Sequence, residues 1–452
     1  MTNDLTRGNP AKLIVLFTIP LLLGNIFQQF YSMADTVIVG RTISVQALAA
    51  VGSTGSLTFL IIGFAQGLTS GFAVLTAQRF GAGDMNGVRK SVAAGALLCA
   101  GISILLTIFS VLFSYDILKL MGTPSDIIND AYRYVVVIFS GIAASVLFNF
   151  LSNIIRALGD SKTPLVFLII ACLLNIGLDF LFILKFHTGV AGAAWATIIS
   201  QMVSGLLCLI YIAKSLPALH LSRDDWNVGW RLLYEHLRVG FPMGFQSSII
   251  AIGSMILQST LNTLGSTAVA AYTAAQKIDQ LSTQPLMSFG IAMATYTAQN
   301  YGAGDMHRIR SGVRQCSMIS VLFSLAAGGT IILLSRPLLR AIIGAGQENV
   351  VALSRVYLII NCSLYFMLSL LFIYRYTLQG LGKSLIPTVA GIMELIMRTL
   401  VAVYLGGTIG FPGICLANPT AWFGALLPLS IAYFITIHML IKKNPPPESV
   451  SI

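Results

Sequence analysis

Long apolar runs separated by short polar breaks dominate this chain of 452 residues. An α-helix needs about 20 mostly apolar residues to cross the hydrocarbon layer of a membrane. The runs predict twelve spans, at 13–38, 46–78, 91–114, 131–157, 163–185, 190–214, 235–262, 267–299, 312–335, 351–379, 384–405 and 414–441. The segments that remain are too short for a soluble domain. We therefore predict an all-α polytopic membrane protein.

The composition excludes other classes of protein. Hydrophobic residues make up 56% of the chain and charged residues 10%, whereas a soluble domain carries about 25% charged residues. Disorder is excluded because it requires low hydrophobicity. The net charge of +11 does not indicate a nucleic-acid-binding protein, because the basic residues lie between apolar runs and not in one patch. The six cysteines lie inside apolar runs without CxxC spacing, which favours buried thiols over disulfides or metal ligands.

The positions of Lys and Arg predict the orientation in the membrane. If the N-terminus is cytoplasmic, most of the 27 basic residues, Arg375 among them, flank the cytoplasmic ends of the spans, as the positive-inside rule requires. An even number of spans then puts both termini in the cytoplasm, and we expect the plasma (inner) membrane. A cleaved signal in the first span is the alternative, but eleven more spans and no secreted domain follow it.

The chain contains an internal duplication. Residues 76–85 read TAQRFGAGDM and residues 297–306 read TAQNYGAGDM, at an offset of about 221 residues. Near the same offset, Pro20 matches Pro242, RALGDSKTP matches QGLGKSLIP, and Gly189 matches Gly410. We predict an N-terminal lobe at 1–215, a cytoplasmic linker at 216–236 and a C-terminal lobe at 237–452. The linker suits either a short helix at the membrane surface or an ordinary loop.

Each copy holds six spans, so both copies enter the membrane from the same side. Such repeats are related by a pseudo-two-fold axis along the membrane normal, and two six-helix lobes facing each other suit alternating access. A duplication that serves folding alone is the alternative. The repeated GAGDM loops predict tight turns in which Asp84 and Asp305 are helix N-caps.

Four acidic residues lie within the predicted spans: Asp35, Asp179, Asp279 and Glu394. A charge at the bilayer centre costs at least about 2.5 kcal/mol, so each one requires a partner or a function. Helix rise puts Asp179 and Thr197 at similar depth in the outer half of the membrane, and Asn175 is one turn from Asp179. The oxygens of these side chains and of Asp35 suit Na⁺ or a shared proton. A hydrogen bond from Asp179 to a neighbouring helix is the structural alternative.

The second copy differs from the first in its charges. Lys277 and Asp279 align with uncharged residues of the first copy, which favours ion coupling in the first lobe and a different role in the second. Lys277 and Asp279 are two residues apart and point to different sides of a helix, so Lys277 could instead meet another carboxylate. Glu394 and Arg398, at i and i+4, predict a salt bridge.

Together these motifs resemble the multidrug and toxic compound extrusion (MATE) family, bacterial type. The resemblance rests on Pro20 followed by Gln28, Gln29 and Asp35, on the paired GAGDM loops, on RALGDSKTP and on the segment 175–179 before GVAGAAWAT. It implies two lobes with a V-shaped opening. In many members the positions of Asp35, Asn175, Asp179 and Thr197 form the cation site. Some members also carry acidic residues in spans 7 and 10, whereas here span 7 offers only Gln246 and Gln258, and span 10 has no acid.

We therefore predict a secondary active multidrug exporter, not an enzyme, that antiports organic cations or amphipathic drugs against H⁺ or Na⁺. No cofactor other than the coupling ion is expected, and the sequence does not predict the oligomeric state. Aromatic and Met side chains suit a drug cavity, although plain packing is the alternative for each of them. The predicted cavity residues are Gln28, Gln29, Phe30, Tyr31, Tyr272, Lys277, Asp279, Met287 and Met293.

Two other functions compete with this prediction. A lipid-linked oligosaccharide or peptidoglycan precursor flippase of the same superfamily would line its cavity with several Arg or Lys, but only Lys277 and Arg398 lie more than four residues from the end of a predicted span. An intramembrane enzyme would need a reactive motif such as HExxH or GxSxG, which the sequence lacks.

Overall fold

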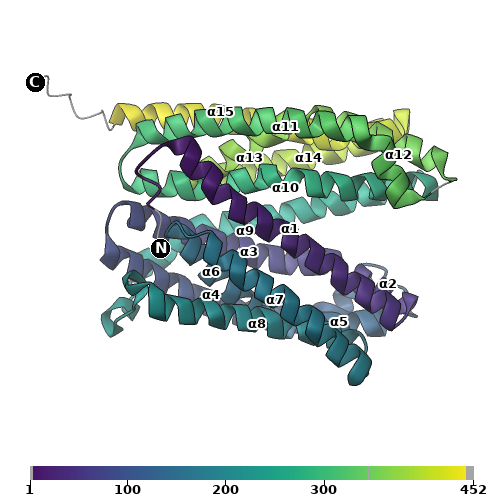
Figure 1. Cartoon of the computed structure of the whole chain (residues 1–452), viewed down its shortest axis with the longest axis horizontal. Coiled ribbons are helices and arrows are strands. Elements are labelled where there is room, and N and C mark those ends of the chain that lie inside the picture. The colour runs from purple at the N-terminus through teal and green to yellow at the C-terminus, as the bar shows by residue number, and fades with distance from the viewer. Residues whose placement is uncertain (1–3, 345, 444–452) are drawn as a thin grey trace, which may run out of the picture. The chain divides into compact units, whose positions relative to one another are not determined.

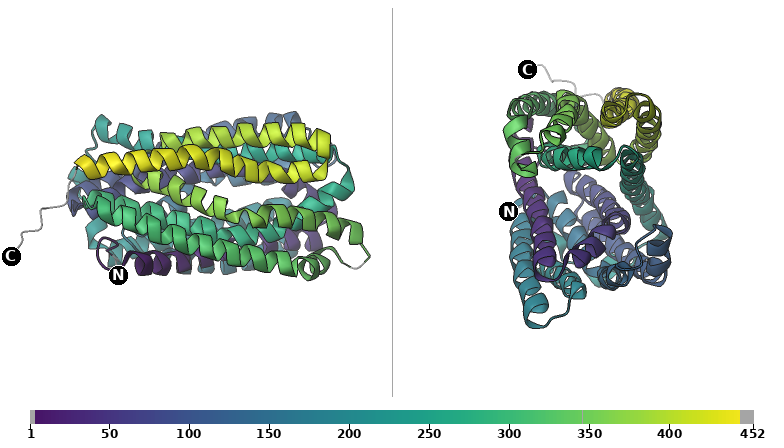
Figure 2. Two further views of the ribbon diagram at one scale, coloured as in Figure 1. Left: turned by 90° about the horizontal axis from the view of Figure 1, so that it is seen from above. Right: turned by 90° about the vertical axis from the view of Figure 1, so that its right-hand side faces the viewer.

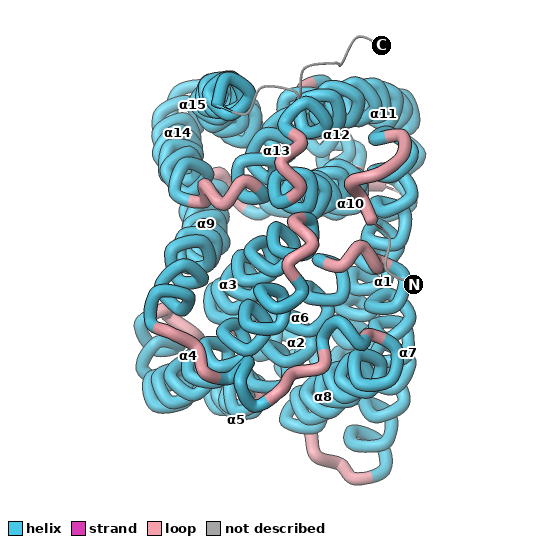
Figure 3. The backbone as a smooth tube through the Cα atoms, turned by 90° about the vertical axis from the view of Figure 1, so that its left-hand side faces the viewer, coloured by secondary structure: helices cyan, strands magenta, loops and turns pink. Residues whose placement is uncertain are grey.

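The structure is a computed structural model that describes residues 4–344 and 346–443 (Figure 1). Over these residues the chain consists of helices and short connections, without strands, which confirms the predicted all-α class. The helices are α1 (Pro10–Thr42), α2 (Val45–Ser53), α3 (Gly55–Gly81), α4 (Met85–Leu120), α5 (Ile128–Ser140), α6 (Ile142–Ala157), α7 (Lys162–Phe180), α8 (Val190–Ser215), α9 (Trp230–Asn262), α10 (Ser266–Gly302), α11 (Met306–Ile343), α12 (Glu348–Ser363), α13 (Tyr365–Gly380), α14 (Leu385–Ile409) and α15 (Phe411–Lys443). Figure 3 shows the loops confined to the helix ends.

The helices account for the predicted spans. Within the described residues, nine helical segments are long and apolar enough to cross a membrane, and two bent pairs raise the number to eleven. The bent pairs are α5 with α6, at 47°, and α12 with α13, at 49°. The twelfth predicted span is α10, a helix of 37 residues that is not among the eleven, because polar side chains around Lys277 and Asp279 lower its hydropathy. The chain is a multi-pass membrane protein.

The described residues form two compact units. Unit 1 comprises residues 19–80 and 84–251, and unit 2 comprises residues 4–18, 81–83 and 252–443 without residue 345. Helices α1 and α9 each contribute to both units. The predicted lobe limits of 1–215 and 237–452 concern the duplicated halves of the sequence, and they remain a prediction.

Small residues let the helices of unit 1 pack closely. Helix α8 packs along α6 and α7, and α7 and α8 run side by side in Figure 1. A side chain at Gly205 of α8 would come within 3.0 Å of Leu147 on α6. Gly141, at the bend between α5 and α6, lies against Ile198, and a Cβ atom there would be 2.3 Å from that side chain. Close backbone approach at small residues is typical of membrane helices.

Small residues also let the helices of unit 2 pack closely. Helices α14 and α15 lie along one another, as Figure 2 shows. A Cβ atom at Gly413 would be 2.2 Å from the carbonyl oxygen of Leu405, so the turn between these helices requires glycine there. Helix α10 packs against α13, where Gly380 approaches the carbonyl oxygen of Ala294.

The duplicated motifs have matching local geometry. The Oδ1 atom of Asp84 accepts from the backbone N–H of Gly87, and that of Asp305 accepts from Arg308, both at 2.8 Å. Both predicted N-caps are therefore confirmed. The glycines before them, Gly83 and Gly304, have φ angles of 73° and 78°, a left-handed conformation that favours glycine.

The predicted linker at 216–236 contains no α-helix before residue 230. It forms two 3₁₀ turns, η2 (Pro217–Leu219) and η3 (Arg223–Trp226), and its last residues begin α9. The Asp225 carboxylate accepts from the backbone N–H and the hydroxyl of Ser222, both at 2.8 Å, and lies 3.4 Å from Nε of Arg89 on α4. The hydrogen bonds from Ser222 lower the pKa of Asp225, and Arg89 adds to the effect. The linker is thus attached to α4.

All six cysteines are buried and free, as their apolar surroundings predicted.

Candidate functional site

Helices α1, α7 and α8 of unit 1 bring the predicted cation-site residues together. Asp35 lies on α1, Asn175 and Asp179 lie on α7, and Thr197 lies on α8. Asn175 and Asp179 are fully buried, and Asp35 is 9% exposed. Helix α7 ends one residue after Asp179 and continues as a π turn, η1 (Leu181–Lys185). Such turns are frequent at functional sites.

The Thr197 hydroxyl is the centre of a hydrogen-bond network. It accepts from the Tyr31 hydroxyl at 3.0 Å and from Nδ2 of Asn175 at 3.5 Å. It donates to the carbonyl oxygen of Ala193 at 3.1 Å. Because a hydroxyl has one proton and two lone pairs, Thr197 has no free lone pair in this arrangement. Its contacts connect α1 and α7 to α8, and they orient Tyr31 and Asn175.

The carboxyl groups of Asp35 and Asp179 lie within hydrogen-bonding reach of each other. When both are ionised neither can donate, and four buried acceptor oxygens in the described structure have no donor: Oδ1 of Asp35, both Oδ atoms of Asp179 and Oδ1 of Asn175. Buried acceptors without donors are costly. A proton on one carboxyl supplies the missing donor, and a Na⁺ ion would accept the same hard oxygen ligands. The arrangement can therefore hold either ion.

Sequence reasoning missed two tyrosines of this site. Tyr31 was predicted only as a lining residue of the drug cavity; it lines a small cavity in unit 1, and its hydroxyl also bonds to Thr197. Tyr134 of α5 was not predicted at all, yet it is buried and lies within electrostatic reach of Asp35, Tyr31 and Asp179. Nothing in the sequence around Tyr134 indicates this position, because the approach of its side chain to the carboxyl pair depends on how α5 packs. For Tyr31 a signal exists, since Tyr31 and Asp35 are at i and i+4 and share one face of α1.

A cavity of about 40 Å³ lies in unit 1 beside Tyr31. Its polar lining includes Gln28, Gln66, Asn149 and Gln201. This volume suffices for a small number of water molecules. Gln28, Tyr31 and Asp35 are at i, i+3 and i+7 on α1, so one face of this helix carries both cavity residues and a carboxyl of the cation site.

The remaining predicted cavity residues are in diverse surroundings. Gln29 is partly buried and Phe30 is exposed, both on α1. On α10 in unit 2, Tyr272 and Met293 are packed in the interior, whereas Met287 and Lys277 are exposed. Their role in a drug cavity stays a prediction.

The carboxylate of Asp279 in unit 2 lies among tyrosines. Its Oδ1 atom accepts from the Tyr365 hydroxyl at 2.6 Å, and Tyr357 is a second hydrogen-bonding neighbour. The carboxylate partner predicted for Lys277 is not found, because this side chain has no ion pair within the described residues. Asp279 is therefore held by neutral donors.

A buried ion-pair triad connects α13 and α14. The predicted salt bridge between Glu394 and Arg398 is confirmed, at 2.7 Å. The second carboxylate oxygen of Glu394 pairs with Arg375 at 2.6 Å. Arg375, which was predicted near the cytoplasmic end of its span, is 4% exposed and lies between the helices, and its side of the membrane stays a prediction. The triad carries one net positive charge.

Metal coordination by three or more His, Cys, Asp or Glu residues is not found anywhere in residues 4–344 and 346–443. The only metal predicted was the coupling ion Na⁺, at a site with two carboxylates.

Comparisons with known proteins agree with the duplication and the fold. The family model MatE matches twice, at residues 20–181 and 242–404. The chain is 34% identical over 307 residues to "Probable multidrug resistance protein YpnP" of Bacillus subtilis (strain 168), covering 68% of each protein. It is 28% identical to "Probable multidrug resistance protein YoeA" of the same strain, covering 87% of this chain and 86% of that protein.

Among solved structures, the chain is similar to an outward-facing conformation of a multidrug resistance MATE family transporter. The TM-score is 0.89 at 24% identity, and the match covers 98% of each chain. This likeness concerns the fold. The family model covers most of the chain, so the chain belongs to the MatE family, whose members are transporters and not enzymes.

Proposed function

We propose that this protein is a secondary active multidrug exporter that antiports organic cations or amphipathic drugs against H⁺ or Na⁺ by alternating access. Relatives named for multidrug resistance support the drug part of the proposal. The ion part rests on one observation, namely the buried carboxyl pair of Asp35 and Asp179, three of whose four oxygens are buried without a donor among the described residues. The proposed location is the plasma (inner) membrane with both termini cytoplasmic, where the bilayer and the drugs are the partners.

Ion binding would change the relative free energies of the conformations of α1. When the site is empty, two carboxylates face each other in a buried place, and this arrangement is unfavourable. A proton or a Na⁺ ion removes that repulsion and favours the closed packing of α1 against α7 and α8. Because Gln28 and Tyr31 lie on the same face of α1 as Asp35, a movement that follows ion binding also changes the wall of the cavity.

Conversely, loss of the ion would release the contact between Asp35 and Asp179. The hydrogen bond between Tyr31 and Thr197 then remains as the tether of α1 to α8. A ligand can shift a conformational equilibrium only by its difference in affinity for the two states. The proposal therefore requires that the ion binds the packed state of α1 more tightly than any other state.

Efflux of a cationic dye such as ethidium from vesicles tests the proposal, with pH and Na⁺ gradients imposed separately. We expect export with one gradient and loss of gradient-driven export in Asp35→Asn and Asp179→Asn. Asp126→Asn, at an exposed loop position, is the matched control and should keep the activity of the parent. Parent-like export by both site variants would disprove the site. Dye export by the parent that is independent of both gradients would disprove the antiport.

A further inference from the structure

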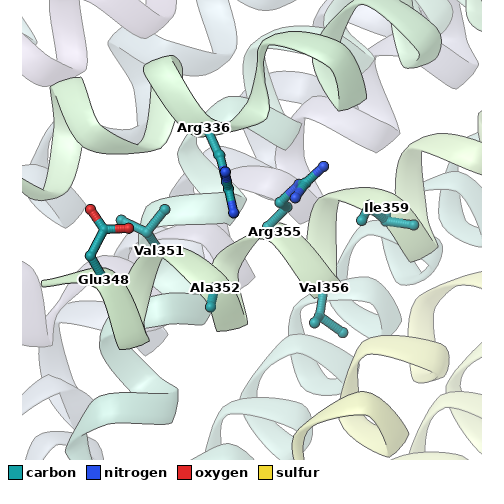
Figure 4. Close-up of a pocket in the computed structure, with 7 residues that line it drawn as sticks. All are labelled: Arg336, Glu348, Val351, Ala352, Arg355, Val356 and Ile359. Atoms are coloured by element: carbon teal, nitrogen blue, oxygen red, sulfur yellow. The ribbon is translucent and has the colours of Figure 1, made fainter.

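Two arginine side chains extend into one pocket between α11 and α12 of unit 2 (Figure 4). The pocket has a volume of about 220 Å³. Arg336 comes from α11, and Arg355 comes from α12. The other lining residues are Glu348, Val351, Ala352, Val356 and Ile359, so cationic and apolar side chains share the lining.

The positive charge of this pocket is not neutralised. The one carboxylate in its lining, Glu348, pairs with Arg340 at 2.8 Å. Neither Arg336 nor Arg355 has an ion pair within the described residues. Moreover, Nε of Arg355 is buried and lacks an acceptor in the part of the chain that the structure describes. Two adjacent guanidinium groups repel each other, and an anion between them would turn this repulsion into two charge-assisted contacts.

The location suits an anion at the membrane surface. Helix α11 has 38 residues and is about 57 Å long at 1.5 Å per residue, so its ends extend beyond a hydrocarbon layer about 30 Å thick. In the predicted orientation, Arg336, Arg340 and Arg355 belong to the few basic residues on the non-cytoplasmic side. Basic residues are generally depleted on that side, so three of them close together indicate a local function for their charge.

The apolar surroundings favour a lipid over a water-soluble anion. Ile359 in the pocket wall is 40% exposed, and Leu333 on α11, one turn before Arg336, is 83% exposed. Side chains of this kind offer a surface to acyl chains below a headgroup. Basic pockets between membrane helices bind anionic lipid headgroups at the cytoplasmic or matrix surface, and the same pairing of guanidinium with phosphate is available to this pocket.

From this juxtaposition we infer that the pocket is a binding site for an anionic phospholipid. The guanidinium groups of Arg336 and Arg355 hold the phosphate, and the acyl chains lie along Leu333 and Ile359. The inference is independent of the proposed drug transport, because the pocket shares no residue with the cation site.

Native mass spectrometry of the purified full-length protein in detergent tests this site. The probes are phosphatidylglycerol, phosphatidylcholine with the same acyl chains, and glycerol phosphate. We expect the parent to bind phosphatidylglycerol more tightly than phosphatidylcholine. The Arg336→Gln/Arg355→Gln variant should lose that preference, with an affinity for phosphatidylglycerol roughly tenfold lower. Arg133→Gln, another exposed arginine predicted on the same side, is the matched control and should bind like the parent.

Each other outcome overturns the inference. If the double variant binds phosphatidylglycerol like the parent, the two arginines do not form the site. If glycerol phosphate competes with phosphatidylglycerol at equal concentration, the ligand is a soluble anion. Should the double variant fail to fold, the single variant Arg336→Gln replaces it. This side chain is exposed, so its loss should leave the fold intact and still reduce phosphatidylglycerol binding several-fold.

Discussion

Asp35 and Asp179 meet inside unit 1 as two carboxyl groups within hydrogen-bonding reach, and no other group among the described residues donates to Oδ1 of Asp35 or to either oxygen of Asp179. The helices around them supply acceptors, namely the amide oxygen of Asn175 and the carboxyl oxygens themselves. A site built from acceptors alone is incomplete without a proton or a cation. This relationship is the physical basis of the proposed coupling.

The first prediction follows from the missing donor. Asp179→Asn places an amide beside Asp35, and its N–H groups can donate to the carboxylate. We expect this variant to be as stable as the parent or more stable by about 1 kcal/mol, although gradient-driven export is lost. Asp179→Leu removes the charge without adding a donor and should be less stable than Asp179→Asn. Thermal denaturation in detergent measures both, and the reverse order would contradict the interpretation.

The second prediction concerns the tether between α1 and α8. Thr197→Val removes the hydroxyl that accepts from Tyr31 and Asn175 while keeping the shape of the side chain. The hydrogen bond that joins α1 to α8 is worth about 1 kcal/mol, so we expect gradient-driven dye efflux to fall several-fold. Thr197→Ser keeps the hydroxyl and is the matched control. Parent-like efflux by Thr197→Val would show that the hydroxyl does not matter.

The spans and the N-caps could be predicted from the sequence because they depend on local patterns. The predicted span 384–405 is close to α14 (Leu385–Ile409), and Asp84 and Asp305 cap the helices that follow them. The meeting of Asn175, Asp179 and Thr197 followed from helix rise, because α7 and α8 are consecutive and antiparallel. These inferences need no knowledge of distant contacts.

The remaining features depend on contacts between segments far apart in the sequence. The predicted span 131–157 is bent at Gly141, where Ile198 of α8 packs against the backbone. The pairing of Arg375 with Glu394 was not predicted, because helical spacing reveals Arg398 as a partner of Glu394 but does not reveal a partner on another helix. Tyr134 was missed for the same reason. The order of residues along one helix carries no information about what packs against it.

The third prediction concerns the triad in unit 2. Glu394→Gln leaves Arg375 and Arg398 buried without their counter-ion, and breaking a buried pair in this way costs about 3–5 kcal/mol. Glu348→Gln breaks the pair with Arg340, whose side chains are 54% and 62% exposed, and exposed pairs contribute at most about 1 kcal/mol. Thermal denaturation should therefore show a large loss for the first variant and a small one for the second. Similar losses would mean that the triad adds no stability.

The fourth prediction concerns the linker and its dependence on pH. Hydrogen bonds from Ser222, aided by Arg89, lower the pKa of Asp225. A carboxyl group whose pKa is lowered by folding stabilises the protein at pH values above its unfolded pKa of about 3.9. This stabilisation is lost as the pH falls through the lower pKa of the folded state. The difference in stability between the parent and Asp225→Asn should thus be constant from about pH 8 to pH 5 and shrink below about pH 4.

Limited proteolysis of the linker over this pH range, with an acid-tolerant protease at the lower end, measures the difference. Asp224→Asn is the matched control, because Asp224 is the exposed neighbour and accepts no hydrogen bond from the side chain or backbone N–H of Ser222 in the described structure. Its cleavage should follow that of the parent at every pH. If Asp225→Asn is cleaved like the parent at pH 7, or if the difference persists unchanged to pH 3, the carboxylate of Asp225 does not hold the linker to α4.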